Sequence, residues 1–317
     1  MDIILETIKK NRPNLGTSSI KTYISGINAL SSGMQIELTK PEHLISNYKQ
    51  ILEYMKDFKP NPRKTKIASI IAVIDDKHNE HTEELKEALD AYKKQMFADA
   101  DIIHEKDKSQ KLSLNQELNF ITWDEVIEKY EELKKIAEPI FKLKRITEKQ
   151  YFTLQNYILL SLYTMIPPRR SLDYADFKLR NIDENKDNYM LRHGKTKNSK
   201  SSFVFNSYKN SSRLGKQVIS IPKELASLID KWGKINAGEY LLSTAEFKPI
   251  TQTRIASMLN KIFGKKISTS MLRHIYLTEK FGDVDLEDLH ETTEAMGNSE
   301  ISRSLAYVSK ENAKKDE

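Results

Sequence analysis

The sequence contains no cysteine, which excludes disulfide bonds, a thiol nucleophile and any thiolate metal site. It also lacks a long apolar run. The most hydrophobic stretch, residues 157–166, has ten residues and is too short to span a bilayer. The first residues include Asp2 and Glu6 and form no apolar secretory segment. We therefore expect no membrane association and an intracellular location, either cytoplasmic or nuclear.

Common nucleotide and metal signatures are missing as well. The tetrapeptide HGKT at 193–196 lacks the first glycine of a phosphate-binding loop, and no glycine-rich turn precedes it. His78 and His81 are three residues apart, but no third metal ligand lies near them in the sequence. No serine hydrolase, zinc protease or kinase motif is present. The sequence thus predicts no metal site, no nucleotide cofactor and no other cofactor.

Positive charge is what the chain has in excess. Its 51 Lys and Arg residues against 45 Asp and Glu residues give a net charge of +6 and a pI of about 9.0. This balance favours an anionic partner, because Lys and Arg neutralise phosphates and release counterions. Residues 192–216 contain seven basic residues and no acidic one, so we expect a phosphate-facing surface there. A solvated polar hairpin is the alternative.

The order of predicted elements indicates two domains. Residues 1–103 show helical periodicity, interrupted by a basic, proline-containing loop at 56–66. Residues 104–118 are polar, lack periodicity and are expected to form a linker. Residues 119–317 combine helices with short strands near 188–192, 202–205 and 217–221. The predicted fold class is mainly α with a small antiparallel β-sheet. Helices are expected at 18–30, 41–55, 67–74, 83–96, 122–133, 149–165, 224–235, 251–263, 270–281, 286–296 and 301–308.

Two segments of the second domain resemble boxes of the tyrosine recombinase (integrase) family. The stretch TMIPPRRSLDYADFKLRNID at 164–183 is similar to the family box TGLRxSELLxLxxxDID, with Arg170 on its arginine and Asp173 on its acid. The stretch SMLRHIYLT at 270–278 is similar to the box HxLRHTxxT, with Arg273 on its arginine. Both arginines therefore fall on functional positions of the family.

The third segment supplies a tyrosine. Residues 296–299, MGNS, and Tyr307 resemble the family's LGHxxxxxTxxYxH box, and Tyr307 follows Asn298 by nine residues, as the tyrosine follows the histidine in the family. The resemblance covers about residues 120–310. Residues 1–103 are similar, more weakly, to the family's core-binding DNA-binding domain, and PPRR resembles recombinases of virophages and giant-virus mobile elements.

The resemblance implies a metal-independent reaction. Tyr307 would be the nucleophile and would form a 3′-phosphotyrosine intermediate. Arg170 and Arg273 would hold the non-bridging oxygens of the scissile phosphate, where charge grows in the transition state. Arg169 is a rival for the first of these roles, because the two prolines before it leave the register open. Asp173 is expected to orient an arginine rather than to act as an acid.

A lysine on a β-hairpin protonates the leaving oxygen in this family. Residues 206–222, NSYKNSSRLGKQVISIP, resemble the strand–Lys–strand pattern, and Lys209 takes the lysine position. Lys195 and Lys197 are alternatives, because this hairpin region is longer than usual.

Two family histidines are absent from the chain. Ser270 stands at the position of the box-two histidine, and Asn298 at that of the third-box histidine. Neither is a base near neutral pH. Asn298 can donate a hydrogen bond to a phosphate oxygen, and Ser270 can do the same or cap its helix. His274 is a further candidate, although in the family this position is usually structural. The group that deprotonates Tyr307 is left open.

The implied function is site-specific DNA recombination, in the setting of viral or mobile-element integration. The partner would be double-stranded DNA, with four protomers assembling two sites. Alternatives are a type IB topoisomerase, which acts as a monomer, and a non-catalytic DNA-binding protein that kept the fold. The residues expected to contact DNA are Lys64, Lys66, Lys195, Lys197, Lys200 and Arg213.

Overall fold

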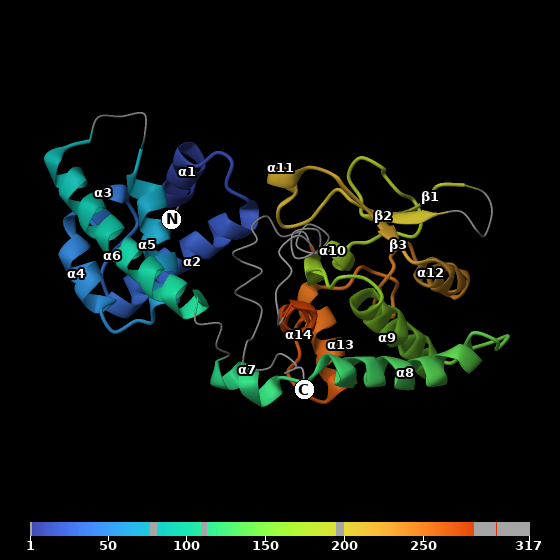
Figure 1. Ribbon diagram of the computed structural model, residues 1–317. Coiled ribbons are helices and arrows are strands. Elements are labelled where there is room, and N and C mark those ends of the chain that lie inside the picture. The colour runs from blue at the N-terminus through green and yellow to red at the C-terminus, as the bar shows by residue number, and fades with distance from the viewer. Residues whose placement is uncertain (1, 77–80, 109–112, 195–199, 282–295, 297–317) are drawn as a thin grey trace. The chain divides into compact units, whose positions relative to one another are not determined.

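The computed structural model describes residues 2–76, 81–108, 113–194, 200–281 and 296. Its contacts divide the chain into two compact units, Met1–Ser109 and Gln110–Glu317 (Figure 1). Each unit has its own cluster of buried apolar side chains. The helices predicted at 286–296 and 301–308 lie outside the described residues, except for Met296.

The N-terminal unit is helical throughout its described part. Helix α5 lies at its centre, where α1, α2, α3 and α6 all pack against it. Seven residues of α5 are buried, six of them consecutively from Ser69 to Ile74, so this helix has no solvated face in its second half. The helices are α1 (Asp2–Asn11), α2 (Thr17–Met34), α3 (Pro41–Ser46), α4 (Tyr48–Tyr54), α5 (Pro60–Ile74) and α6 (Glu83–Lys108).

A buried ion pair joins α5 to α6. Arg63 Nε donates to the two carboxylate oxygens of Asp99 at 3.2 and 3.0 Å, and Nη2 donates to one of them at 2.6 Å. Nη1 donates to the carbonyls of Met55 and Lys56, at the end of α4. The Asp99 side chain is fully buried. Hydrogen bonding to Asp99 raises the pKa of Arg63, so the guanidinium stays charged. Arg63 therefore acts as a clamp, by which we mean a side chain that links α4, α5 and α6 through hydrogen bonds.

Three predicted boundaries in this half of the chain are wrong. The basic loop at 56–66 ends early, because Pro60 occupies the first turn of α5, where its missing N–H costs nothing. The predicted linker, 104–118, contains the last turn of α6 and all but the last residue of α7 (Leu114–Asn119), which starts at a capping box between Ser113 and Gln116. The helix predicted at 41–55 is broken at Asn47 into α3 and α4.

The C-terminal unit is an assembly of helices with one small sheet (Figure 1). Strand β2 is central, pairing antiparallel with β1 on one side and with β3 on the other, and Phe205 lies opposite Gln217. The predicted fold class, mainly α with a small antiparallel sheet, is confirmed. The elements after α7 are α8 (Trp123–Ile140), α9 (Glu148–Thr164), α10 (Ser171–Ala175), β1 (Tyr189–Arg192), β2 (Ser201–Phe205), α11 (Ser211–Leu214), β3 (Gln217–Ile221), α12 (Lys223–Ile235), α13 (Gln252–Phe263) and α14 (Thr269–Phe281).

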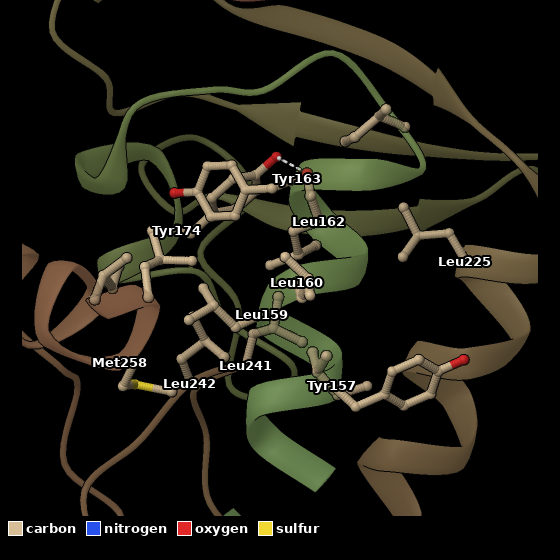
Figure 2. Packing of buried hydrophobic residues seen from close by; sticks show 14 of the residues in the cluster. Tyr157, Leu159, Leu160, Leu162, Tyr163, Tyr174, Leu225, Leu241, Leu242 and Met258 are labelled. Atoms are coloured by element: carbon tan, nitrogen blue, oxygen red, sulfur yellow. Dashed lines mark hydrogen bonds between the residues drawn. The ribbon is translucent and has the colours of Figure 1, made fainter. Parts of the chain in front are cut away.

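Helix α9 forms the middle of this unit's core. It begins at a capping box between Thr147 and Gln150, and nine of its residues are buried. Figure 2 shows its leucines and Tyr157 packed among side chains from other elements, including Leu225 of α12 and Met258 of α13. Because α9 is held on several sides, its C-terminal end is a fixed starting point for the segment that follows. Of the described helices, none is both long and apolar enough to cross a bilayer.

Candidate active site

The first arginine segment lies between α9 and α10. Helix α9 ends at Thr164, and Pro167 and Pro168 prevent it from continuing. The chain reaches α10 with Arg170 in an extended conformation at the N-cap (φ −72°, ψ 151°). Successive side chains of extended backbone point to opposite sides. This geometry explains why Arg169 is fully buried while its neighbour Arg170 is only half-buried.

The Arg169 guanidinium makes hydrogen bonds through its N–H groups and also lies against aromatic rings. Its Nε donates to Asp173 Oδ2 at 2.7 Å, and Nη2 donates to Gln217 Oε1 at 3.0 Å. The guanidinium carbon lies 4.0 Å from the ring centroid of Phe205 and 5.4 Å from that of Tyr208. Such contacts between a cation and aromatic faces are favourable and directional. Arg169 therefore connects α10 to the sheet strands β2 and β3.

Three arginines act on one buried carboxyl group. Asp173 is fully buried on α10. Burial raises the pKa of its carboxyl, and the positive charges of Arg169, Arg170 and Arg273 act against that rise. Arg273 reaches this cluster from α14, where its side chain is 1% exposed. The fold thus brings together the arginines of two segments that are about a hundred residues apart in the sequence.

Helix α14 places its candidate residues differently. Ser268 Oγ accepts a hydrogen bond from the backbone N–H of Met271 at 3.2 Å, so Ser268 caps this helix end. Ser270 is exposed in the first turn and is not the cap. His274 follows the buried Arg273 and is half-buried, as expected for a residue turned by about 100° around the helix.

Lys209 lies in the connection between β2 and β3. Its side chain is exposed. The preceding residue, Tyr208, donates a hydrogen bond to the carbonyl of Gly215 at 2.8 Å, which closes the connection on itself. Gly215 has a φ of 68°, a left-handed conformation that favours glycine. Since Tyr208 also contacts the Arg169 guanidinium, the connection that carries Lys209 is anchored to the arginine cluster.

The basic residues of 192–216 differ in their surroundings. Arg192 pairs with Asp230 of α12 and donates to Ser201 Oγ at 2.8 Å, so its charge is already paired within the protein. By contrast, Lys200, Arg213 and Lys216 are exposed. Lys195 and Lys197 lie outside the described residues. In the N-terminal unit, Lys64 is half-buried on α5, and Lys66 Nζ donates to the carbonyl of Gly26 at 3.4 Å.

The third segment, with Asn298 and Tyr307, lies outside the described residues. Tyrosines that the structure does place near the arginines are poor nucleophiles. Burial raises the pKa of Tyr163, Tyr174 and Tyr208 above the ordinary phenol value, so their hydroxyl groups stay protonated.

A cavity of about 300 Å³ is lined in part by α10 and by residues next to β1. Two aspartates line it, and an ion pair of 3.1 Å joins one of them, Asp187, to Lys178. A cavity with this lining is a poor match for a phosphate. Its lining residues are Leu172, Asp176, Lys178, Lys186, Asp187, Asn188, Ser207 and Tyr240.

Sequence reasoning missed the residues that hold Arg169. Gln217, Phe205 and Tyr208 lie 36 to 48 residues beyond it. Only Tyr208 had a usable signal, since it precedes the candidate lysine within a family-like pattern. Gln217 and Phe205 belong to strands whose pairing brings them to the arginine, and no local pattern marks them.

The sequence matches no protein-family model and no curated protein. Solved structures do resemble the fold. A dimer of lambda integrase(75-356) bound to a COC' core site aligns with a TM-score of 0.52 at 13% identity, covering 100% of this chain and 98% of that one. The chain has the tyrosine recombinase fold.

Two further structures with this fold align less closely. A lambda integrase tetramer bound to a Holliday junction has a TM-score of 0.47 at 13% identity, covering 100% of this chain and 78% of that one. XerA recombinase has a TM-score of 0.39 at 12% identity, covering 96% and 92%.

Proposed function

We propose that the protein is a site-specific DNA recombinase that cleaves and rejoins DNA through a 3′-phosphotyrosine at Tyr307. The observation that carries the proposal is a buried carboxyl, Asp173, that is hydrogen-bonded to Arg169 and lies within the electrostatic influence of Arg170 and Arg273, in a tyrosine recombinase fold. Guanidinium groups bind phosphate oxygens with paired hydrogen bonds, which suits a reaction at a phosphodiester.

The two neighbouring arginines have different proposed roles. Arg169 is directed to Asp173 and Gln217 and lies against two aromatic rings, so it orients the cluster. Arg170 stands half-buried at the N-cap of α10, with no hydrogen bond from its side chain to the helix end. Arg170 and Arg273 are therefore the proposed phosphate ligands.

The reaction balances without a metal or an energy source. The Tyr307 oxygen attacks the scissile phosphorus, a phosphorus–oxygen bond forms, and the bond from phosphorus to the 5′ oxygen breaks. Lys209 gives its proton to the departing 5′ oxygen. Rejoining runs these steps in reverse, because the phosphotyrosine keeps the bond energy. Asn298 and Ser270 would donate hydrogen bonds, and His274 is the candidate for receiving the phenol proton.

The remaining parts of the proposal concern partners. Relatives in fold are described as a dimer on a core site and a tetramer on a Holliday junction. By analogy, the N-terminal unit would bind duplex DNA as a core-binding domain, and several protomers would assemble on two sites. Integration of a viral or mobile element is the proposed setting.

The test begins with selection of bound sequences from a library of randomised DNA duplexes. The selected sequence is then made as a duplex with a nick just beyond each possible cleavage position, so that the released fragment diffuses away and the covalent product accumulates. A denaturing gel should show a protein–DNA adduct with the wild-type chain and none with Tyr307→Phe.

Three other outcomes would change the proposal. Selective binding without an adduct at any nick position would indicate a non-catalytic DNA-binding protein. An adduct that persists in Tyr307→Phe would refute the choice of nucleophile alone. Relaxation of supercoiled DNA by a monomer, with no strand transfer between two duplexes, would indicate a type IB topoisomerase.

A further inference from the structure

The Asn188 side chain forms a buried junction between α10 and the start of the β2–β3 connection. It directly precedes β1, and only 3% of the residue is exposed. Its amide nitrogen donates to the carbonyl of Asp173 at 3.0 Å and to that of Ser207 at 2.7 Å. Its amide oxygen accepts from the backbone N–H groups of Asn206 and Ser207, both at 2.9 Å. The amide thus makes four hydrogen bonds, each to the backbone.

The partners of Asn188 belong to the two parts of the candidate site. Asp173 is the carboxylate on which the arginine charges act, and its carbonyl is part of α10. Asn206 and Ser207 open the β2–β3 connection, three and two residues before Lys209. A single amide therefore fixes the distance between the backbone of the arginine cluster and the backbone that leads to the lysine.

An amide is the side chain that this junction requires. It supplies two donors and an acceptor with two lone pairs, and all four hydrogen bonds use them. An aspartate would set a carboxylate oxygen against two carbonyl oxygens. An alanine would remove the partner of four backbone groups, of which the carbonyl of Asp173 is in the buried hydrogen bond and the others are in partly buried ones. The requirement is geometric, because neither end of the amide carries a charge.

We propose that Asn188 is a positioning residue that holds Lys209 in place relative to the arginine cluster, so that the lysine protonates the leaving 5′ oxygen. This inference rests on the proposed recombinase function. It predicts a defect in one chemical step, leaving-group protonation, rather than in phosphate binding or nucleophilic attack.

The test compares two leaving groups on the same nicked duplex. One substrate has the normal 5′ oxygen at the scissile bond, and the other has sulfur in its place. A thiolate is a stable leaving group near neutral pH and needs no proton donor. We expect Asn188→Ala and Lys209→Ala to slow adduct formation at least about 10-fold with oxygen, as loss of a general acid does, and to regain most of the wild-type rate with sulfur.

Gln155 provides a matched control. It is a buried amide on α9 in the same unit, and it exchanges two hydrogen bonds with the backbone of Ser243, at 3.0 and 2.8 Å. Gln155→Ala should also lower the thermal midpoint, while its ratio of oxygen to sulfur rates stays that of the wild type. If Asn188→Ala does not fold, Asn188→Asp is measured in its place, because it keeps the two accepted hydrogen bonds.

The outcomes separate this inference from the function on which it rests. Equal slowing of Asn188→Ala on both substrates, or no slowing on either, would overturn the positioning role and leave the recombinase proposal intact. A wild-type chain that forms no adduct on either substrate would overturn the recombinase proposal itself.

Discussion

Among the described residues, each unit contains a buried arginine–aspartate pair, and the two pairs have different surroundings. Arg63 donates to Asp99 and to backbone carbonyls at a helix end, so its hydrogen bonds join main-chain elements. Arg169 donates to Asp173 and lies on aromatic rings, and the charges of two further arginines reach the same carboxyl. The first arrangement is a clamp between helices. The second concentrates cationic groups, which a structural clamp does not need.

Arg63→Ala should cause the largest loss of stability. Removing this partner leaves the Asp99 charge buried and unpaired, which typically costs about 3–5 kcal/mol. Both tryptophans, Trp123 and Trp232, belong to the C-terminal unit. During urea unfolding of the full chain, the part of the circular dichroism signal that comes from the N-terminal unit should therefore disappear at a lower urea concentration in the variant. The midpoint of the tryptophan fluorescence transition should stay that of the wild type. An equal shift of both unfolding midpoints would show that the two units unfold together. A decrease of less than about 1 kcal/mol in the free energy of unfolding would contradict the role of Arg63 as a clamp.

Substitutions in the arginine cluster should act on the reaction instead. Arg170→Ala, and Arg273→Lys, which keeps the charge but loses the planar fork, should each slow adduct formation by about 10²–10³-fold. Rates are measured with saturating protein on the selected nicked duplex, and thermal melting confirms folding. Arg254, exposed on α13, supplies a control, since Arg254→Ala should retain the wild-type rate. Wild-type rates for both cluster variants would refute the proposed phosphate ligands.

Exchange of each whole pair for apolar residues sharpens the comparison. Buried ion pairs can often be replaced by apolar residues of similar volume at little cost. We expect Arg63→Met/Asp99→Leu and Arg169→Met/Asp173→Leu both to remain folded, within about 2 kcal/mol of the wild type. Only the second double variant should slow adduct formation. If both variants cleave DNA at the wild-type rate, the Arg169 pair is a clamp like the first.

The smallest expected effects concern exposed charges. Lys200→Ala and Arg213→Ala should each reduce the slope of log binding constant against log salt by about 1, as loss of one phosphate contact does. Arg192→Ala is the matched control within the same segment, because this arginine is paired with Asp230 and should leave the slope unchanged. DNA binding is measured by fluorescence anisotropy at several salt concentrations. Identical slopes for all three variants would place the phosphate contacts elsewhere.

Much of the fold followed from local signals in the sequence. The helices expected at 122–133 and 224–235 start within a residue of α8 and α12, and the short strands were placed within a residue of β1, β2 and β3. The errors came from signals with two meanings. The two prolines among basic residues at 56–66 suggest a loop, but a proline is equally acceptable in the first turn of a helix. The segment from Pro60 is helical because the apolar residues that follow it pack in the core as part of α5.

The site was less predictable than the fold. The family-like segments indicated which arginines to consider, but two consecutive arginines after two prolines give no local clue as to which one is buried. Arg169 is the buried arginine because it contacts Asp173, Gln217 and Phe205. The sheet brings Gln217 and Phe205 close to it from distant positions in the sequence. Contacts of this kind depend on strand pairing, and a single sequence does not encode them in any local pattern.

The surroundings of Arg169 also constrain how this sequence can change over time. One guanidinium contacts the carboxylate of Asp173 in α10, the ring of Phe205 at the end of β2, the ring of Tyr208 in the β2–β3 connection and the amide of Gln217 at the start of β3. A substitution at any one of these four neighbours changes the fitness effect of substitutions at the other three. Divergence at this position should therefore proceed by linked replacements, so that descendants of this chain differ there as a group or not at all.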